Sequence, residues 1–215
     1  MSKMVTKSGL GIVLSRLKGF DKPKVRVEQY EVDAEIAADV LWQAKLIGDI
    51  GDMEKVSVDL GCGTGLLGIG ALVLGAKKVY FVESDSSALD RAKANWKKVE
   101  SEHKTGGKAV FLCQDIREFS ESEEKIDVVI ENPPFGTKVR HSDRIFLEKA
   151  VKLAPVVYSF HKSSTKKFIE GFCRDNDFMI THVWDFNFPI KASQKFHKRK
   201  IHRIEVSCFR LERKN

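Results

Sequence analysis

The sequence lacks the features of several large classes of protein. It has 5 prolines and 15 glycines in 215 residues, too few for a collagen-like or low-complexity chain, and its 42% hydrophobic residues are too many for a disordered one. Its longest apolar run, residues 66–74, contains two glycines and is far shorter than the roughly 20 residues of a membrane span. No signal-peptide cleavage site follows the apolar patch at residues 9–14. We therefore expect a cytoplasmic, globular protein.

Paired cysteines are also absent. Cys62, Cys113, Cys173 and Cys208 form no Cys-x-x-Cys pair, and the six histidines show no metal-ligand spacing. We therefore expect reduced thiols and no bound metal.

Positive charge is concentrated toward the carboxyl terminus. Residues 137–215 hold 18 basic and 8 acidic side chains, whereas residues 1–136 hold 19 basic and 22 acidic ones. A concentrated positive field attracts polyanions, so this third of the chain is a candidate nucleic-acid surface. A solvated lysine-rich surface would have the same composition.

From residue 55 onward, short runs rich in β-branched and aromatic residues alternate with helical stretches. This alternation predicts βα units and a parallel sheet that is covered on both faces. The predicted strands are 55–60, 79–83, 109–113, 126–131 and 156–160, and the predicted helices lie near 66–74, 87–99, 144–153 and 164–176.

The pattern differs at both ends of the chain. Two strand-like runs, 178–188 and 201–211, are separated only by a basic loop, which predicts an antiparallel hairpin. Residues 36–47 have an apolar helical face, and Asp33 is its expected N-cap. We therefore expect an N-terminal helical arm (1–52) packed on one α/β domain (53–215) with a Rossmann-like, seven-stranded, mostly parallel sheet.

The first predicted strand leads into a glycine-rich turn, residues 59–65, at the position where doubly wound sheets bind nucleotides. Leu66 stands where a dinucleotide fingerprint has its third glycine. Asp59 would repel a pyrophosphate but attract an ammonium group, which favours an aminoacyl nucleoside as ligand. Alternatively, the glycines only permit a tight turn and Asp59 caps the helix.

Two further carboxylates follow neighbouring strands. Glu83 closes the second strand, where it can accept hydrogen bonds from ribose hydroxyls, and Asp115 follows the third, where it can meet an adenine amino group. Together with the glycine turn, this arrangement resembles the S-adenosylmethionine site of class I methyltransferases. The resemblance implies that fold, with S-adenosyl-L-methionine as the cofactor.

The fourth predicted strand leads into Asn132-Pro133-Pro134-Phe135, where the prolines must end the strand. A rigid turn would fix the Asn132 amide and the Pro133 carbonyl as acceptors for both protons of an amino group such as N6 of adenine. Phe135 offers a face on which the base can stack. The alternative is a proline turn with an incidental asparagine.

This tetrad resembles the Asn-Pro-Pro-aromatic signature of amino-group methyltransferases. Enzymes that methylate DNA adenine, RNA adenine and the glutamine amide of release factors share the signature, so it leaves the substrate open. The loops expected at the same sheet edge are basic and suit a single-stranded nucleotide. The candidate RNA-contacting residues in them are Lys138, Arg140, Lys162, Lys195, Phe196, His197, Lys198, Arg199 and Lys200.

Five segments together resemble the methyltransferase-like protein five family, whose members are small ribosomal-subunit RNA adenine-N6 methyltransferases. The segments are 28–30, 59–67, 132–137, 158–165 and 195–198, and the resemblance runs from about residue 19 to residue 210. Asn132, Pro133, Pro134 and Phe135 are the predicted catalytic residues. The predicted cofactor-binding residues are Gln29, Asp59, Gly61, Cys62, Gly63, Gly65, Glu83, Asp115, Ile116 and Asn132.

The chain departs from the family pattern at two places: Glu31-Val32 replaces a usual Pro-Thr, and Glu83 replaces a usual aspartate. The resemblance also implies a small zinc-ribbon activator subunit that adds a strand beside an edge strand of the enzyme. The apolar run 109–113 is the expected edge, although an edge strand can also simply be exposed.

The expected function is therefore N6-adenine methylation of structured RNA, with small-subunit ribosomal RNA as the expected substrate. A release-factor glutamine N5 methyltransferase would need a recognition extension that the chain lacks. A DNA adenine methyltransferase would need a separate domain to read duplex sequence. A non-catalytic ribosome-assembly factor that binds RNA would share the basic surface and stays open as an alternative.

Overall fold

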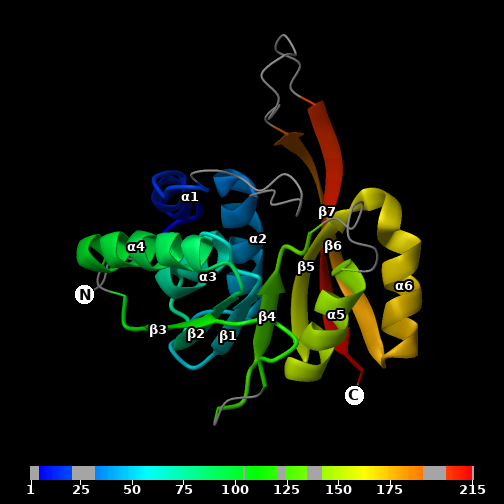
Figure 1. Cartoon of the computed structure of the whole chain (residues 1–215). Helices are drawn as coiled ribbons and strands as arrows, with labels where there is room; N and C mark the ends of the chain where they lie inside the picture. Colours follow the sequence, from blue (N-terminus) through cyan, green and yellow to red (C-terminus); the bar gives the residue numbers. More distant parts are fainter. Residues whose placement is uncertain are drawn as a thin grey trace.

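The computed structural model describes residues 5–20, 32–103, 105–120, 124–134, 142–190 and 202–214. Its centre is a seven-stranded sheet with the strand order β3-β2-β1-β4-β5-β7-β6 (Figure 1). The strands are β1 (Val56–Leu60), β2 (Lys78–Glu83), β3 (Lys108–Cys113), β4 (Val128–Glu131), β5 (Val156–Lys162), β6 (Phe178–Ile190) and β7 (His202–Arg213).

Helices cover both faces of this sheet, as the alternating pattern predicts (Figure 1). One face packs against α2, α3 and α4, with α1 outside them, and the other face packs against α5 and α6. The helices are α1 (Lys7–Ser15), α2 (Ala34–Ile47), α3 (Leu66–Val73), α4 (Ser86–Glu102), α5 (Ser142–Leu153) and α6 (Lys166–Asp175), with a short 3-10 helix η2 (Ser163–Thr165) before α6. None of the helices in the described ranges is both long and apolar enough to cross a membrane.

Five strands, β1 to β5, are parallel, and the chain changes direction across the sheet between β1 and β4. In doubly wound sheets this switch point is the usual ligand crevice. β7 then inserts antiparallel between β5 and β6. The predicted parallel sheet with a C-terminal antiparallel hairpin is confirmed, and the hairpin projects beyond the other strands in Figure 1.

The helices α1 and α2 come from the predicted N-terminal arm. Asp33 caps α2 as expected, because its side chain accepts a hydrogen bond from the Glu35 N–H at 2.9 Å. Leu10 and Leu41 are fully buried in the core that these helices share with α3 and one face of the sheet. The arm therefore contributes apolar side chains to the central core.

A buried ion pair joins the end of α2 to the C-terminal strands. Arg210 of β7 donates to both carboxylate oxygens of Asp49, at 2.6 and 3.0 Å, and Tyr158 of β5 donates its hydroxyl to Asp49 at 2.6 Å. Arg210 also donates to Thr181 and Glu212. A buried charge is tolerated because several hydrogen bonds compensate it, so each partner depends on the others.

Replacing Arg210 with alanine would leave Asp49 buried without its counter-charge. We expect the free energy of unfolding, measured by urea denaturation, to fall by about 3–5 kcal/mol. The control is Lys93→Ala, which removes an exposed ion pair with Asp90 on α4 and should leave the urea midpoint unchanged within error. Equal midpoints for Arg210→Ala and the wild type would contradict this account.

Candidate active site

The glycine turn after β1 is shaped by two close aromatic rings. The backbone adopts positive φ at Gly61 (70°) and Gly63 (53°). A Cβ atom on Gly61 would lie 2.6 Å from the ring of Phe146, and one on Gly63 would lie 3.0 Å from the ring of Phe20. Only glycine fits both the backbone conformation and the space at these two positions.

Glu83 lies at the end of β2, as predicted, and fastens the glycine turn to that strand. Its Oε2 accepts from the Gly63 N–H at 3.0 Å, and its Oε1 accepts from the Asp85 N–H at 2.8 Å. Oε1 also accepts from the Ser84 hydroxyl at 3.4 Å. Each carboxylate oxygen has two acceptor positions, so Oε2 retains capacity for a further donor such as a ribose hydroxyl.

Asp59 is buried beneath the turn. Its Oδ2 accepts from the Gly68 N–H in the first turn of α3 at 2.7 Å. Burial, reinforced by the nearby negative charge of Glu83, raises its pKa to about 7, while the bond to Gly68 opposes the rise. This contact corresponds to the helix-capping role that the sequence left as an alternative. The expected contact with a ligand ammonium group stays a prediction.

The residues after β3 form a smaller polar group. Arg117 donates through Nε and Nη2 to the two carboxylate oxygens of Asp115, at 2.9 and 2.7 Å, and these bonds lower the pKa of Asp115 to about 2. Asp115 is therefore a permanently ionised acceptor near neutral pH. Ile116 beside it is buried, as is Cys62 in the glycine turn, where burial raises the thiol pKa and keeps the sulfur un-ionised.

The two sequence motifs meet at one edge of the sheet. In the β1–β4 register Leu60 pairs with Glu131, so Gly61 and Asn132 are the next residues of two neighbouring strands. The ladder of β4 stops at Glu131 because Pro133 and Pro134 lack backbone N–H groups. Lys162 ends β5 at the same edge. The structure thus brings the first part of the tetrad beside the glycine turn.

Several predicted site residues lie outside the described ranges. They are the cofactor candidate Gln29, the stacking candidate Phe135, and the RNA candidates Lys138, Arg140, Lys195, Phe196, His197, Lys198, Arg199 and Lys200. Their predicted roles stay predictions.

Sequence reasoning missed Asn95, which ties the N-terminal segment to the glycine turn. This α4 side chain is 4% exposed; its amide donates to the carbonyls of Lys18 (2.9 Å) and Thr64 (3.0 Å), and its oxygen accepts from the Lys18 N–H (3.0 Å). The contact holds the segment that carries Phe20 against the turn. The available signal was a polar residue at a core-facing position of an amphipathic helix.

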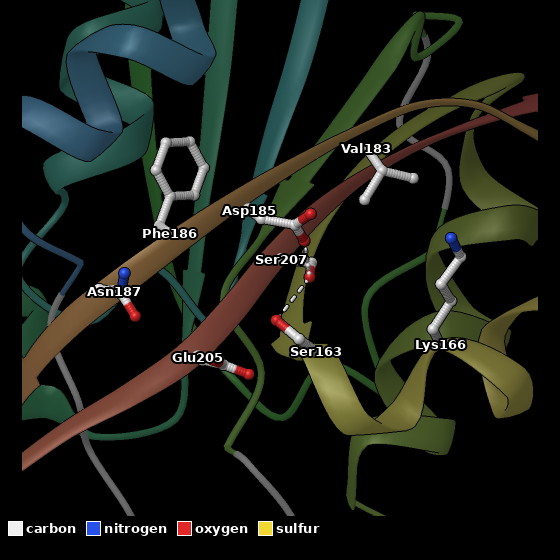
Figure 2. A pocket seen from close by; sticks show the side chains of 8 residues that line it. All are labelled: Ser163, Lys166, Val183, Asp185, Phe186, Asn187, Glu205 and Ser207. Carbon is white, nitrogen blue, oxygen red and sulfur yellow. Dashed lines mark hydrogen bonds between the residues drawn. The ribbon is translucent and has the colours of Figure 1, made fainter.

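A cavity of about 350 Å³ lies between the start of α6 and the β6–β7 hairpin (Figure 2). Figure 2 shows Ser207 between Ser163 and Asp185; the hydroxyls of Ser207 and Ser163 are 2.7 Å apart. The cavity is lined by two carboxylates and one lysine, so the cavity is not a basic phosphate site. Within the described ranges no group of three His, Cys, Asp or Glu side chains is arranged to hold a metal ion.

Glu131 is a second buried carboxyl group at the site. It is fully buried, its Oε1 accepts from the Ser159 hydroxyl at 2.7 Å, and burial raises its pKa from 4.5 to about 8 although the Ser159 bond opposes the rise. In the described residues its Oε2 has no hydrogen-bond partner. A buried, neutral carboxyl group therefore directly precedes Asn132.

Comparisons with known proteins agree with this geometry. The family model described as the methyltransferase small domain matches residues 37–155. Sequence identity is 37% with uncharacterized protein MJ0284 of Methanocaldococcus jannaschii (98% of this chain, 95% of that one) and 36% with rRNA N(6)-adenosine-methyltransferase METTL5 of Danio rerio (92% and 94%). The crystal structure of PH1948 from Pyrococcus horikoshii superposes with a TM-score of 0.84 at 40% identity, over 97% of this chain and 98% of that one.

The fold and the paired turns define a class I methyltransferase that uses S-adenosyl-L-methionine. More narrowly, the chain belongs to the methyltransferase small domain family and to the rRNA N6-adenosine-methyltransferase METTL5 family. The family resemblance, the fold class and the cofactor expected from the sequence are confirmed.

Replacing Glu131 with glutamine should change how stability depends on pH. The carboxyl group has a pKa of about 8 in the folded chain against 4.5 ordinarily, so the folded state retains its proton more tightly. The wild type's free energy of unfolding, relative to Glu131→Gln, should be highest below pH 4.5 and fall by a few kcal/mol as pH rises toward 8. Urea denaturation of both proteins from pH 5 to 9 measures this difference. Because both proteins retain Asp59, its contribution to the pH dependence of stability cancels in the comparison.

Parallel stability curves for the two proteins across that range would show that Glu131 has an ordinary pKa. A difference that grows with pH in favour of the wild type would contradict the sign of the shift.

Proposed function

We propose that this chain transfers a methyl group from S-adenosyl-L-methionine to N6 of an adenosine in ribosomal RNA, and more narrowly in the small subunit. The observation that carries the proposal is the placement of Asn132-Pro133 and the Gly61–Gly65 turn at the ends of two paired strands. The printed names of the zebrafish and fruit-fly relatives, both rRNA N(6)-adenosine-methyltransferases, support the substrate.

The cofactor fits the glycine turn for a structural reason. The turn has glycine at positions 61, 63 and 65. Glu83 ends β2 and Asp115 follows β3, and both strands lie on one side of β1. We assign cofactor contacts to Gln29, Asp59, Gly61, Cys62, Gly63, Gly65, Glu83, Asp115, Ile116 and Asn132.

The chemistry depends on alignment of the amine. When bound, the cofactor supplies a methyl group that its sulfonium already activates. The Asn132 amide oxygen and the Pro133 carbonyl oxygen would each accept a hydrogen bond from one of the two N–H groups of the adenine amine. These bonds localise the nitrogen lone pair and direct it toward the methyl carbon, while Phe135 would stack on the base. In this proposal no side chain needs to remove a proton before transfer, and the proton leaves to water afterwards.

RNA would approach along the basic loops at the same edge. Lys162 ends β5 there, and the other proposed contacts are Lys138, Arg140 and residues 195–200. Lysine and arginine bind phosphates regardless of base sequence, which suits a loop of RNA with one splayed adenosine. The cytoplasmic location expected from the sequence stays a prediction.

Replacing Asn132 with alanine should abolish methyl transfer, because the variant loses one of two acceptors for the amine. Cofactor binding should stay largely intact, because the other assigned cofactor contacts remain. The measurement uses radiolabelled S-adenosylmethionine with total ribosomal RNA. Cofactor binding is followed by the rise in melting temperature that the cofactor causes. Glu83→Ala is the complementary variant: it should reduce that rise, because the glycine turn loses its anchor to β2.

Three outcomes would contradict the proposal. Label on a release factor but never on RNA would indicate a glutamine methyltransferase. RNA binding without any transfer by the wild type would indicate an assembly factor. Full methyl-transfer activity of Asn132→Ala would show that the Asn132 amide is not needed for catalysis.

We also propose that a small zinc-ribbon activator pairs with β3, the edge strand next to β2. The N–H groups of Lys108 and Gln114 donate toward β2, so by alternation the N–H of Ala109 points away from it, toward the open edge. The side chains of residues 109–112 are half-buried, which leaves apolar surface at this edge. Such an edge suits strand addition.

Ala109→Pro should therefore weaken activator binding without breaking the β2–β3 ladder, because the N–H that it removes faces outward. Co-expression with a zinc-ribbon protein of the same genome, followed by size-exclusion chromatography, measures the complex. Ala109→Ser retains the N–H and is the control. Unchanged binding by Ala109→Pro would place the activator elsewhere.

A further inference from the structure

Three buried polar side chains form a hydrogen-bonded chain next to the tetrad. The Ser159 hydroxyl donates to Glu131 Oε1 at 2.7 Å and lies 2.7 Å from His161 Nε2. Glu131 and Ser159 are fully buried, and His161 is 2% exposed. Buried polar groups are expensive unless they are hydrogen-bonded, so a chain of three in this place calls for a role.

The order of the three residues excludes a hydrolytic role. A nucleophilic triad needs the histidine between the serine and the carboxylate, whereas here Ser159 lies between Glu131 and His161. The Ser159 hydroxyl thus has two hydrogen-bond partners, Glu131 Oε1 and His161 Nε2, whichever ring nitrogen of His161 carries the proton. The hydroxyl is thereby held from both sides and cannot act as a nucleophile.

These three hydrogen-bonded side chains lie where the backbone pairing of β4 with β5 ends. Glu131 and Ser159 are the last registered pair of β4 and β5, and the prolines that follow Asn132 have no N–H to continue it. β5 itself runs on to Lys162. The same register continued for two residues puts His161 level with Pro133. Side-chain hydrogen bonds thus replace main-chain ones at the point where the acceptor groups of the tetrad leave the sheet.

We propose that Glu131, Ser159 and His161 are positioning residues, which hold the Asn132 amide and the Pro133 carbonyl at the spacing that the target amine requires. The inference rests on the proposed function for its substrate. The three side chains act through the backbone that follows Glu131, not by touching RNA or cofactor. Rigid placement matters because misplacing an acceptor by about 1 Å can cost on the order of a hundredfold in rate.

The first experiment compares kcat and KM in four variants, with labelled cofactor and ribosomal RNA. Glu131→Ala and Ser159→Ala should lower kcat about tenfold or more and leave the KM for S-adenosylmethionine within about twofold. Glu131→Gln retains the acceptor oxygen and should restore kcat to within about threefold of the wild type.

Val129→Ala is the matched control for lost stability. Val129 is fully buried on the same face of β4, two residues before Glu131, and pairs with Val157 of β5, not with Ser159. This variant should lower the melting temperature but leave kcat within about twofold of the wild type.

A second measurement needs no methyl transfer. The side-chain amide NMR signals of Asn132 are assigned by their loss in Asn132→Ala. They should form one sharp pair in the wild type and in Glu131→Gln, and broaden or multiply in Glu131→Ala, because the Asn132 amide then samples several positions.

The outcomes separate this inference from the proposed function. A wild type that methylates no RNA counts against the proposed function, and the NMR comparison then decides the positioning role alone. A single unchanged Asn132 pair in Glu131→Ala overturns the inference. So does a Glu131→Ala protein whose kcat matches that of Val129→Ala, or one that loses cofactor affinity in parallel with kcat.

Discussion

The site depends on the parallel pairing of β1 with β4. Each strand ends in a turn that its own sequence enforces, glycines after Leu60 and prolines after Asn132, and the pairing of Leu60 with Glu131 sets these turns side by side. A shift of one residue in this register would reverse the faces of all side chains on β4. The buried apolar residues on both sides of β4 therefore also fix the distance between the two motifs.

Much of this arrangement could be predicted from the sequence because its signals are local. Glycines in the turn, prolines that stop β4 and the change of pattern after residue 178 each constrain the backbone at the residue where they occur. Glu83 could be placed because carboxyl ends of parallel strands share one edge. The five segments that resemble the methyltransferase-like protein five family then indicated an RNA adenine substrate, which the spacing of the glycines and prolines alone leaves open.

Other features could not be predicted because they join residues that are far apart in the chain. The hydrogen bonds of Asn95 join residues 18, 64 and 95, and the ion pair of Asp49 with Arg210 spans 161 positions. The contact of Glu131 with Ser159 needs the register of two strands. Taken singly in the sequence, Asn95, Asp49, Arg210, Glu131 and Ser159 are ordinary polar residues, and only the fold shows that their side chains are buried and paired.

The position of β7 between β5 and β6 also determines the order in which the chain can assemble. β6 is synthesised before β7, yet β7 is its only sheet neighbour among the described strands, so β6 has no strand partner until residues 202–213 follow. Asp49 likewise gains its ion-pair partner only after Arg210 has been synthesised. During synthesis the amino-terminal part can collapse early, whereas this edge of the sheet closes last, when β7 pairs with both β5 and β6.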